Sequence, residues 1–420
     1  MPVIVQKYGG SSIADVDKIK KIAGMIGAVK KAGYDVVAVV SAMGKTTNQL
    51  IESAKFLSPN PDKRELDMLL STGERISMAL LCIALNELGI KAISLTGSQS
   101  GIITNDRYND ARVIEIRPFR VQDELAKGKV VVIGGFQGVS YKRDITTLGR
   151  GGSDTSAVAM AAALNAERCE IYSDVDGVYS ADPNLIKDAR HLPELSFQQL
   201  QEMSEAGAKV LNAQAIQFAK ESKIAIYARS TFLPGKETVI RESQPTGKTA
   251  VIGIVHETDI VRIIYRHKNI KDILEFLDRN NVSVKELNIL QGKLNEDSRM
   301  SFVISKNNIH SWEKLKEELE LLFQDNISID DSLGAVSLIG EGFSRDNRII
   351  SAAGRRDFRC LSKLSQAPCP CRGSCASTAA SPRNARCNRD NYAYMAMYGP
   401  QSQPYLCAFI SVAQPLNSKN

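Results

Sequence analysis

The 420-residue chain lacks several features on which whole classes of protein depend. No run of about 18 apolar residues occurs in it, so we expect no membrane-spanning segment. The N-terminus, MPVIV, goes straight into an apolar run without the basic-then-apolar pattern of a secretion signal. The sequence therefore predicts a cytoplasmic protein with no membrane partner.

Cysteine and histidine are scarce before residue 354. Only Cys82 and Cys169 of the eight cysteines lie there, in apolar surroundings that favour buried structural thiols. The chain has four histidines, and all of them lie outside the glycine-rich segments described below. We therefore expect no metal ion held by protein side chains and no catalytic histidine.

Excess positive charge is confined to one end of the chain. The formal net charge is +6, but nine of the 53 Lys and Arg residues lie after position 354, against two of the 47 Asp and Glu residues. The rest of the chain is close to neutral, so we expect no nucleic-acid partner.

The same end, residues 354–420, is also poor in regular pattern. It holds six of the fourteen prolines, six of the eight cysteines and no glutamate. Cys369, Cys371 and Cys375 match no ordinary zinc spacing. We expect a disordered tail rich in Cys, Pro and Arg. We hypothesise that it is an out-of-frame or foreign C-terminus, which sequencing of the coding DNA would test.

Strand-like and helix-like patterns alternate over residues 1–235. Apolar runs typical of buried strands lie at 3–5, 35–40, 91–96, 129–133, 167–179 and 224–228. Five of these strand ends carry Gly, Ser, Thr or Asp. The pattern predicts an α/β fold with an open, mostly parallel sheet sandwiched by helices, and a ligand site at the carboxyl ends of the strands.

Segment 146–156 is the most informative strand end. It places an arginine among three glycines: Gly149, Arg150, Gly151 and Gly152. Glycines allow positive φ and close approach of an anion to the backbone, and arginine matches a carboxylate or phosphate. Ser153 is a good N-cap for a helix over 157–166. A glycine-rich loop is also a common structural turn, but the arginine and the capped helix favour an anion-binding site.

Lys7 precedes a second glycine turn, formed by Gly9 and Gly10. A lysine is usually a solvated surface charge. Its position beside a Gly-Gly turn at a strand end favours a ligand contact instead.

Ser41 and Thr47 offer hydroxyl groups after the second strand. The nearby GKT sequence at 44–46 is not a P-loop, because the glycine required five residues upstream is replaced by Val39.

Acidic residues in two segments have both functional and structural explanations. Glu74 follows Gly73 inside a helical pattern over 64–89, where the glycine indicates either a helix junction or a close backbone approach. Glu74 is either an ordinary helix acid or an acceptor for an ammonium group. The acids of 173–184 suit ribose, magnesium or a helix cap, although Asp-Gly and Asp-Pro are also ordinary turn formers.

The composition changes after residue 235. Residues 236–249 are polar and read as a linker. Residues 250–335 give strands and helices in the order βαββαβ, which predicts a ferredoxin-like domain. Residues 336–353 read as the start of a second such repeat that is truncated.

Seven segments of the first 230 residues carry a family resemblance. They are KYGGSS at 7–12, VSAMG at 40–44, STGER at 71–75, TNDR at 104–107, TTLGRGGSDTS at 146–156, YSDVDGVYSADP at 172–183 and GAKVL at 207–211. In this set and order, the chain resembles the aspartate kinases of the amino-acid kinase family. One such motif is weak evidence, whereas the whole set in sequence is strong.

The resemblance implies ATP-dependent phosphorylation of the side-chain carboxylate of L-aspartate to 4-phospho-L-aspartate. That reaction opens the route to lysine, threonine, methionine and diaminopimelate. It also implies that 250–335 is an ACT-like regulatory domain with lysine or threonine as effector, in a homo-oligomer. The chemistry agrees with the residue inventory, because an ionised carboxylate needs no general base.

The resemblance also assigns roles to individual residues. The implied catalytic residues are Lys7, Asp154 and Lys209. The implied ATP-binding residues are Lys7, Gly9, Gly10, Ser173, Asp174, Tyr179, Asn184 and Lys209, with Mg²⁺ bound through the nucleotide phosphates. The implied aspartate-binding residues are Ser41, Thr47, Glu74, Phe136, Arg150, Gly151, Gly152 and Ser153. Asn184 and Asn212 depart from the family pattern, which has a basic residue and a His-Pro pair near these positions.

Two alternatives stay open at this stage. One is a kinase of the same fold for another small acid, such as acetylglutamate, or for a nucleoside monophosphate. The other is a non-catalytic protein that senses amino acids through the ACT-like region. The pairing of Glu74 with Arg150 favours a zwitterionic amino acid as substrate.

Overall fold

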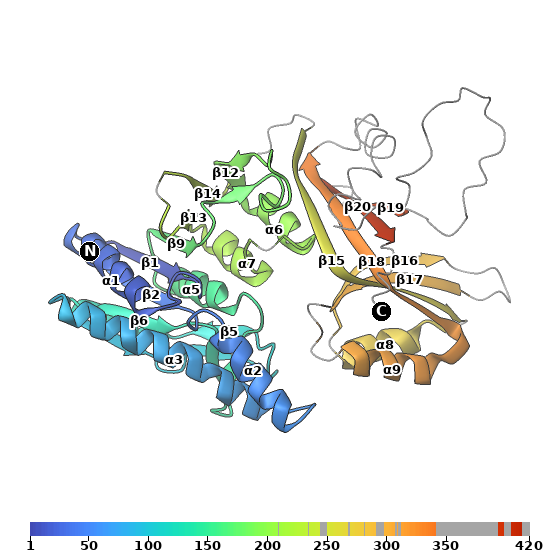
Figure 1. The fold of residues 1–420 in the computed structure, drawn as a ribbon, viewed down its shortest axis with the longest axis horizontal. Helices are drawn as coiled ribbons and strands as arrows, with labels where there is room; N and C mark the ends of the chain where they lie inside the picture. Colours follow the sequence, from blue (N-terminus) through green and yellow to red (C-terminus); the bar gives the residue numbers. More distant parts are fainter. Residues whose placement is uncertain are drawn as a thin grey trace, which may run out of the picture. The chain divides into compact units, whose positions relative to one another are not determined.

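The computed structural model describes residues 1–341 and two further strands, with gaps. The gaps are 209, 234, 244–249, 268, 281, 291–297, 307–308 and 310–311, and the further strands are 394–398 and 405–413. The chain divides into two compact units (Figure 1). The first comprises Met1–Ser180, Ala189–Ser204 and Lys209–Gln244, and the second comprises Ala181–Asp188, Glu205–Ala208 and the chain from Pro245 onward.

An eight-stranded sheet forms the centre of the first unit. Its strand order is β12-β14-β13-β9-β1-β2-β6-β3, and every described pair is parallel except β13 with β14. The strands are β1 (Val3–Tyr8), β2 (Asp35–Val40), β3 (Ala92–Leu95), β6 (Val130–Gly134), β9 (Arg168–Ser173), β12 (Glu194–Ser196), β13 (Ile226–Ser230) and β14 (Glu237–Arg241). The predicted mostly parallel α/β sheet is confirmed.

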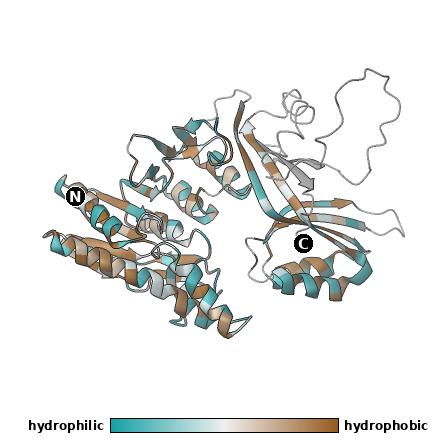
Figure 2. Ribbon diagram, in the orientation of Figure 1, coloured by the Kyte–Doolittle hydropathy of each residue, from teal (hydrophilic) through white to brown (hydrophobic). Residues whose placement is uncertain are grey.

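Helices cover both faces of this sheet. On one face, α1 (Val16–Lys31) and α3 (Lys63–Glu87) bury their apolar stripes against alternate apolar residues of β2 in one continuous core. On the other face, α5 (Gly152–Ala163) packs on β1, β2 and β9 and against α7 (Ala213–Ser222). Residues 152–161 of α5 are all buried, because their side chains are small enough for the helix to lie between the sheet and α7. Brown strands between mixed-colour helices show this layering in Figure 2.

The remaining elements of the first unit are short. They are α2 (Thr46–Leu57), α4 (Phe119–Ala126), α6 (Phe197–Glu205), the strands β4 (Ile102–Thr104), β5 (Val113–Ile116), β7 (Gln137–Ser140) and β8 (Ile145–Thr147), and the hairpin strands β10 (Val178–Tyr179) and β11 (His191–Leu192). Strands β5, β4, β7 and β8 make a second sheet in that order. It packs against α3 through β8.

Helix α3 is the one described helix that is long and apolar enough to cross a membrane by length and composition alone. Half of its apolar window is buried inside the unit, together with Asp67 and Glu74, as expected for a core helix. The helix runs through Gly73 without a junction. A Cβ at Gly73 would lie 2.8 Å from the Cβ of Ala42, so the glycine serves a close backbone approach.

The second unit contains the predicted βαββαβ order. The elements are β15 (Ala250–His267), α8 (Lys271–Arg279), β16 (Val284–Leu290), β17 (Ser298–Ser305), α9 (Trp312–Phe323) and β18 (Ile327–Glu341), with a short 3-10 turn at Gln324–Asn326. The antiparallel strand order β16-β17-β15-β18 and the two helices packed into one core agree with a ferredoxin-like domain.

Three details differ from the expected segmentation. The expected linker 236–249 begins with β14, which pairs with β13 and β12. Residues 336–341 continue β18 rather than start a new element, because β15 pairs with that strand as far as Glu341. The expectation of a tail without strands is wrong for β19 (Tyr394–Tyr398) and β20 (Tyr405–Ala413), whose aromatic and β-branched residues favour strands. The domain boundaries themselves stay a prediction.

Candidate active site at the carboxyl edge of the sheet

The central parallel strands end at the same level. Tyr8 of β1 pairs with Val40 of β2 and with Tyr172 of β9, and Val40 pairs with Gly134 of β6. The segments that follow these strands therefore meet at one edge of the sheet. They are the segments that the sequence singles out by their Gly, Ser and Asp residues.

Lys7 and Asp154 form a largely buried ion pair at this edge. Lys7 Nζ lies 2.7 Å from Asp154 Oδ1, and the two side chains are 12% and 13% exposed. Lys7 comes from β1, and Asp154 comes from the first turn of α5. The carboxylate holds the ammonium group beside the glycine turn, since a Cβ at Gly9 would lie 3.6 Å from Lys7 Nζ.

The glycine turn is packed tightly against its neighbours. A Cβ at Gly10 would lie 2.8 Å from the main-chain oxygen of Ala42, so only glycine fits there. The Gly9 amide donates to the main-chain oxygen of Tyr172 at 3.1 Å. The family resemblance implies that Gly9 and Gly10 bind ATP. The Gly9 amide already serves the junction of β1 with β9, which leaves the Gly10 amide as the candidate phosphate donor.

The Arg150 loop turns through left-handed backbone on both sides of the arginine. Gly149 and Gly151 have φ values of 69° and 72°. Gly151 is the N-cap residue of α5, and Ser153 lies inside the first turn. The prediction that Ser153 caps this helix is therefore wrong. The left-handed Gly151 leads the chain directly into the helix, one turn earlier than the alanine run indicates.

Asn212 anchors this loop from α7. Its Nδ2 donates to the main-chain oxygen of Arg150 at 2.9 Å, and its Oδ1 accepts from Gln214 N at 2.8 Å as the N-cap of α7. The guanidinium of Arg150 is exposed and makes no hydrogen bond or ion pair with the described residues. Sequence reasoning noted Asn212 only as a departure from the family pattern. An Asn before a helical run was the signal that marks it as a cap.

Glu74 presents an unsatisfied carboxylate oxygen. The side chain is 2% exposed, and its Oε1 accepts from Ala42 N at 3.1 Å. Its Oε2 is buried with no hydrogen-bond partner in the described part of the chain. Burial raises the pKa of Glu74 to about 7, although the hydrogen bond from Ala42 opposes this shift. A buried acceptor of this kind fits a cationic ligand better than an ordinary helix acid.

Phe136 lies against the same loop. It has a φ of 65°, unusual for a non-glycine residue, and its amide donates to Ser156 Oγ at 3.1 Å. Its ring would lie 2.9 Å from a Cβ at Gly152, so the ring and the start of α5 are in close contact. Ser41 follows β2 directly, and its amide donates to the main-chain oxygen of Tyr8 at 3.2 Å. Thr47 lies in the first turn of α2, half-buried.

The predicted nucleotide residues are only partly brought together. Ser173 ends β9, where its Oγ accepts from Val175 N at 3.1 Å, and Asp174 beside it is exposed. Tyr179 donates to Asp176 at 2.7 Å. Asn184 lies in 181–188, which clusters with the second unit, and its amide donates to Asp182 as in an ordinary turn. Lys209 lies outside the described residues.

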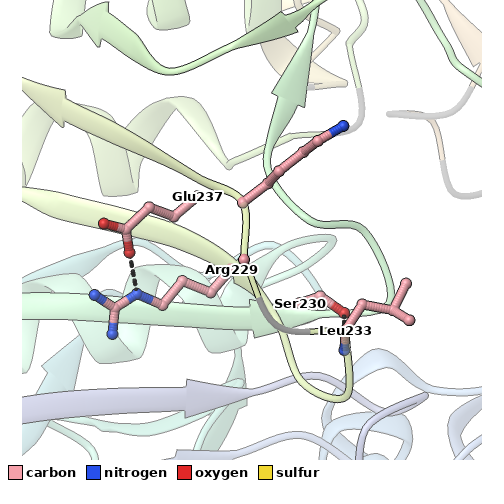
Figure 3. A pocket seen from close by; sticks show the side chains of 6 residues that line it. Arg229, Ser230, Leu233 and Glu237 are labelled. Atoms are coloured by element: carbon pink, nitrogen blue, oxygen red, sulfur yellow. Dashed lines mark hydrogen bonds and ion pairs between the residues drawn. The ribbon is translucent and has the colours of Figure 1, made fainter.

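A cavity of about 300 Å³ lies at the end of β13, where Ser230 pairs with the predicted ATP-binding residue Ser173 of β9. It is lined by Arg229, Ser230, Leu233, Gly235, Lys236 and Glu237 (Figure 3). Arg229 pairs with Glu170, which accepts from Gln6 at 2.8 Å. Gln6 and Lys7 are neighbours on β1 and point to opposite faces of the sheet. Arg229 therefore lies on the face opposite the Lys7–Asp154 pair, whereas Ser230, the next residue of β13, points to the other face.

Comparison with known proteins gives consistent matches. A family model described as the amino acid kinase family matches residues 2–230. The curated aspartokinase of Mycolicibacterium smegmatis is 40% identical over 360 residues, covering 81% of this chain and 84% of that protein. The aspartokinase of Bacillus sp. (strain MGA3) is 41% identical over 349 residues, covering 81% of this chain and 85% of that protein.

Solved structures share the fold. Escherichia coli aspartokinase III in complex with aspartate and ADP has a TM-score of 0.72 at 21% identity, covering 97% of this chain and 96% of that chain. The same enzyme in complex with lysine and aspartate has a TM-score of 0.64 at 21% identity, covering 98% and 96%. At this identity the two structures support the fold alone.

Proposed function

The chain belongs to the amino acid kinase family and, within it, to the aspartokinases, and from this premise we propose how its residues carry out the reaction. Aspartate kinases transfer a phosphoryl group from ATP to the side-chain carboxylate of L-aspartate, and this chain is such a phosphotransferase. The product is 4-phospho-L-aspartate, the first intermediate of the pathway to lysine, threonine, methionine and diaminopimelate.

The reaction brings two anions together. The attacking carboxylate is ionised at neutral pH and needs no general base. The transition state spreads negative charge over the transferring phosphoryl oxygens, so catalysis requires positioned cations and hydrogen-bond donors.

Lys7 supplies the central cation in this proposal. One contact supports the assignment most strongly: Lys7 Nζ lies 2.7 Å from Asp154 Oδ1, so the ammonium group is held in place before the nucleotide binds. Asp154 orients it and does not contact the phosphoryl group itself. The Gly10 amide and Lys209 complete the donors around the phosphates.

L-Aspartate lies between α3 and the Arg150 loop. Glu74 Oε2 accepts the α-ammonium group, which removes the cost of a buried acceptor without a donor. Arg150 binds a carboxylate through its free guanidinium. Ser41, Thr47, Phe136, Gly151, Gly152 and Ser153 form the rest of this pocket.

ATP lies over the ends of β1 and β9. Ser173, Asp174, Tyr179 and Asn184 contact its nucleoside part, and Gly9 shapes the turn beneath its phosphates. Mg²⁺ enters with the nucleotide and is held mainly by its phosphates, as is usual for this ion in phosphoryl transfer. When bound, it neutralises part of the phosphate charge.

The regulatory and cellular assignments complete the proposal. Lysine or threonine binds the ACT-like domain, and the enzyme works as a homo-oligomer in the cytoplasm. The βαββαβ fold of the second unit supports an effector domain, since ACT domains have this fold.

A substrate panel tests the proposed function. The full chain is assayed for ADP release from ATP with L-aspartate, L-glutamate, acetylglutamate and UMP, each with and without lysine and threonine. We expect turnover with L-aspartate and at least about 100-fold lower kcat/KM with the other acceptors, because a site with buried polar groups rejects ligands that leave them unpaired. Turnover with UMP but not with L-aspartate would overturn the assignment of the acceptor site.

A further inference from the structure

Asp67 is a fully buried acid that no part of the proposed reaction uses. It lies on α3 with 0% exposure. Its two oxygens accept from Thr147 N at 2.9 Å, from Thr147 Oγ1 at 2.6 Å and from Asn109 N at 3.0 Å on each oxygen. Every one of these donors lies outside α3: Thr147 ends β8, and Asn109 lies in the turn between β4 and β5. The carboxylate therefore joins the helix to two segments that are distant in sequence.

These two segments support the loop that contains Arg150. Thr147 ends β8 three residues before the arginine. Its main-chain oxygen accepts from Ala111 N at 2.9 Å, which ties it to the segment that contains Asn109. A Cβ at Gly149 would lie 3.0 Å from Asp110 Oδ1, so the two segments are in close contact up to the residue before Arg150.

Asp67 and Glu74 share one face of α3. Seven residues along a helix are close to two turns, or about 10.5 Å along its axis. Helix α3 thus carries Glu74, the proposed acceptor of the ammonium group, and two turns earlier Asp67, which binds the segment just before the Arg150 loop. The distance between Glu74 and Arg150 therefore depends on the contacts of Asp67.

We propose that Asp67 is a positioning residue: it fixes the Arg150 loop relative to Glu74 and so sets the affinity for L-aspartate without touching the substrate. The inference rests on the proposed roles of Arg150 and Glu74. A carboxylate is required because both of its oxygens accept hydrogen bonds. In asparagine, the amide nitrogen would face N–H donors in place of one acceptor.

The test compares Asp67→Asn with Asp62→Asn in the full chain. Asp62 is an exposed residue that caps the same helix. Because Asn is as good an N-cap as Asp, this control removes one negative charge from the helix and keeps the cap. We expect Asp67→Asn to raise KM for L-aspartate at least about tenfold, with KM for ATP within about twofold of wild type. Asp62→Asn leaves both KM values unchanged.

A second, milder variant guards against loss of folding in Asp67→Asn. Thr147→Val removes only the hydroxyl donor and keeps the backbone bond to Asp67. It should raise KM for L-aspartate by at least about threefold, again without an effect on KM for ATP. Equal rises in both KM values, or none in KM for L-aspartate, overturn the proposal.

Combination with Arg150→Ala separates this inference from the proposed function. If Asp67 acts through the loop, Asp67→Asn adds less than about twofold to KM for L-aspartate once Arg150 is alanine. Independent, multiplying effects overturn the positioning role alone. An Arg150→Ala variant with normal KM for L-aspartate instead overturns the assignment of Arg150.

Discussion

Asn212 Nδ2 donates a hydrogen bond of 2.9 Å to the main-chain oxygen of Arg150, which joins the cap of α7 to the loop that opens α5. The two helices pack against each other on the same face of the sheet. This contact holds the backbone of the loop and leaves the Arg150 guanidinium to a ligand. In our proposal, the aspartate pocket is thus assembled from helix ends, and each contact in it can be tested separately.

Asn212 has two roles that substitution can separate. Asn212→Asp keeps the oxygen that caps α7 and loses the donor to Arg150, whereas Asn212→Ala loses both. We expect both variants to raise KM for L-aspartate and only Asn212→Ala to lower the free energy of unfolding, by about 1 kcal/mol. Urea denaturation and steady-state kinetics check this. Equal stability of the two variants would contradict the capping role.

Lys7→Ala should lower kcat about 10²–10³-fold, the range for loss of one preorganised donor to a charged transition state. Lys20→Ala is the matched control, because Lys20 is an exposed lysine on α1. Steady-state ADP release at saturating ATP and L-aspartate measures both. A near-normal kcat in Lys7→Ala would remove Lys7 from the phosphoryl path.

Arg150→Ala should mainly raise KM for L-aspartate, because its exposed guanidinium binds a substrate carboxylate in our proposal. We expect a rise of at least about tenfold, since hydrogen bonds to charged groups contribute about 1.5–3 kcal/mol. Arg150→Lys should recover only part of this, because an ammonium group lacks the planar pair of donors. An effect confined to KM for ATP would refute the assignment.

Glu74 makes binding of L-aspartate depend on pH. Burial raises its pKa to about 7, so the free enzyme loses the anionic acceptor as the pH falls through 7. We expect kcat/KM for L-aspartate to fall about tenfold per pH unit below that value. The Glu74→Gln variant should be weakly active and lack this acid limb. If kcat/KM of the wild type for L-aspartate stays constant between about pH 5.5 and about pH 7.5, Glu74 does not act as the anionic acceptor.

The same group predicts how stability changes with pH. The folded state keeps a proton on Glu74 up to about pH 7, whereas its reference pKa is 4.5, so the folded state binds more protons between these values. The free energy of unfolding therefore falls as the pH rises through this window. Without ligand, Glu74→Gln should have a higher Tm than wild type at pH 8 and a similar Tm at pH 4.5. L-Aspartate should narrow the difference, because its ammonium group pairs with the carboxylate.

Local patterns in the sequence determined the fold class and the family. Alternating apolar periods gave the parallel sheet and the βαββαβ domain, because strand and helix periods depend on residues only a few positions apart. The glycine, serine and acid residues at the strand ends predicted a candidate site at the carboxyl edge of the sheet, because they too are recognised from local sequence alone. The seven family segments added the reaction, which the curated aspartokinases confirm.

Only the tertiary structure decided how these segments cooperate. Lys7 and Asp154 are far apart in sequence, and their 2.7 Å contact exists because α5 packs on β1. The raised pKa of Glu74 depends on its burial, which no local pattern encodes. The same is true of Gly9, whose amide is taken by Tyr172, and of Asp67, which reads as an ordinary helix acid. Contacts between distant segments determine which carboxyl groups are protonated, how charged side chains are oriented and which amides are free to donate. Sequence periodicity cannot predict these contacts, because it depends only on residues a few positions apart.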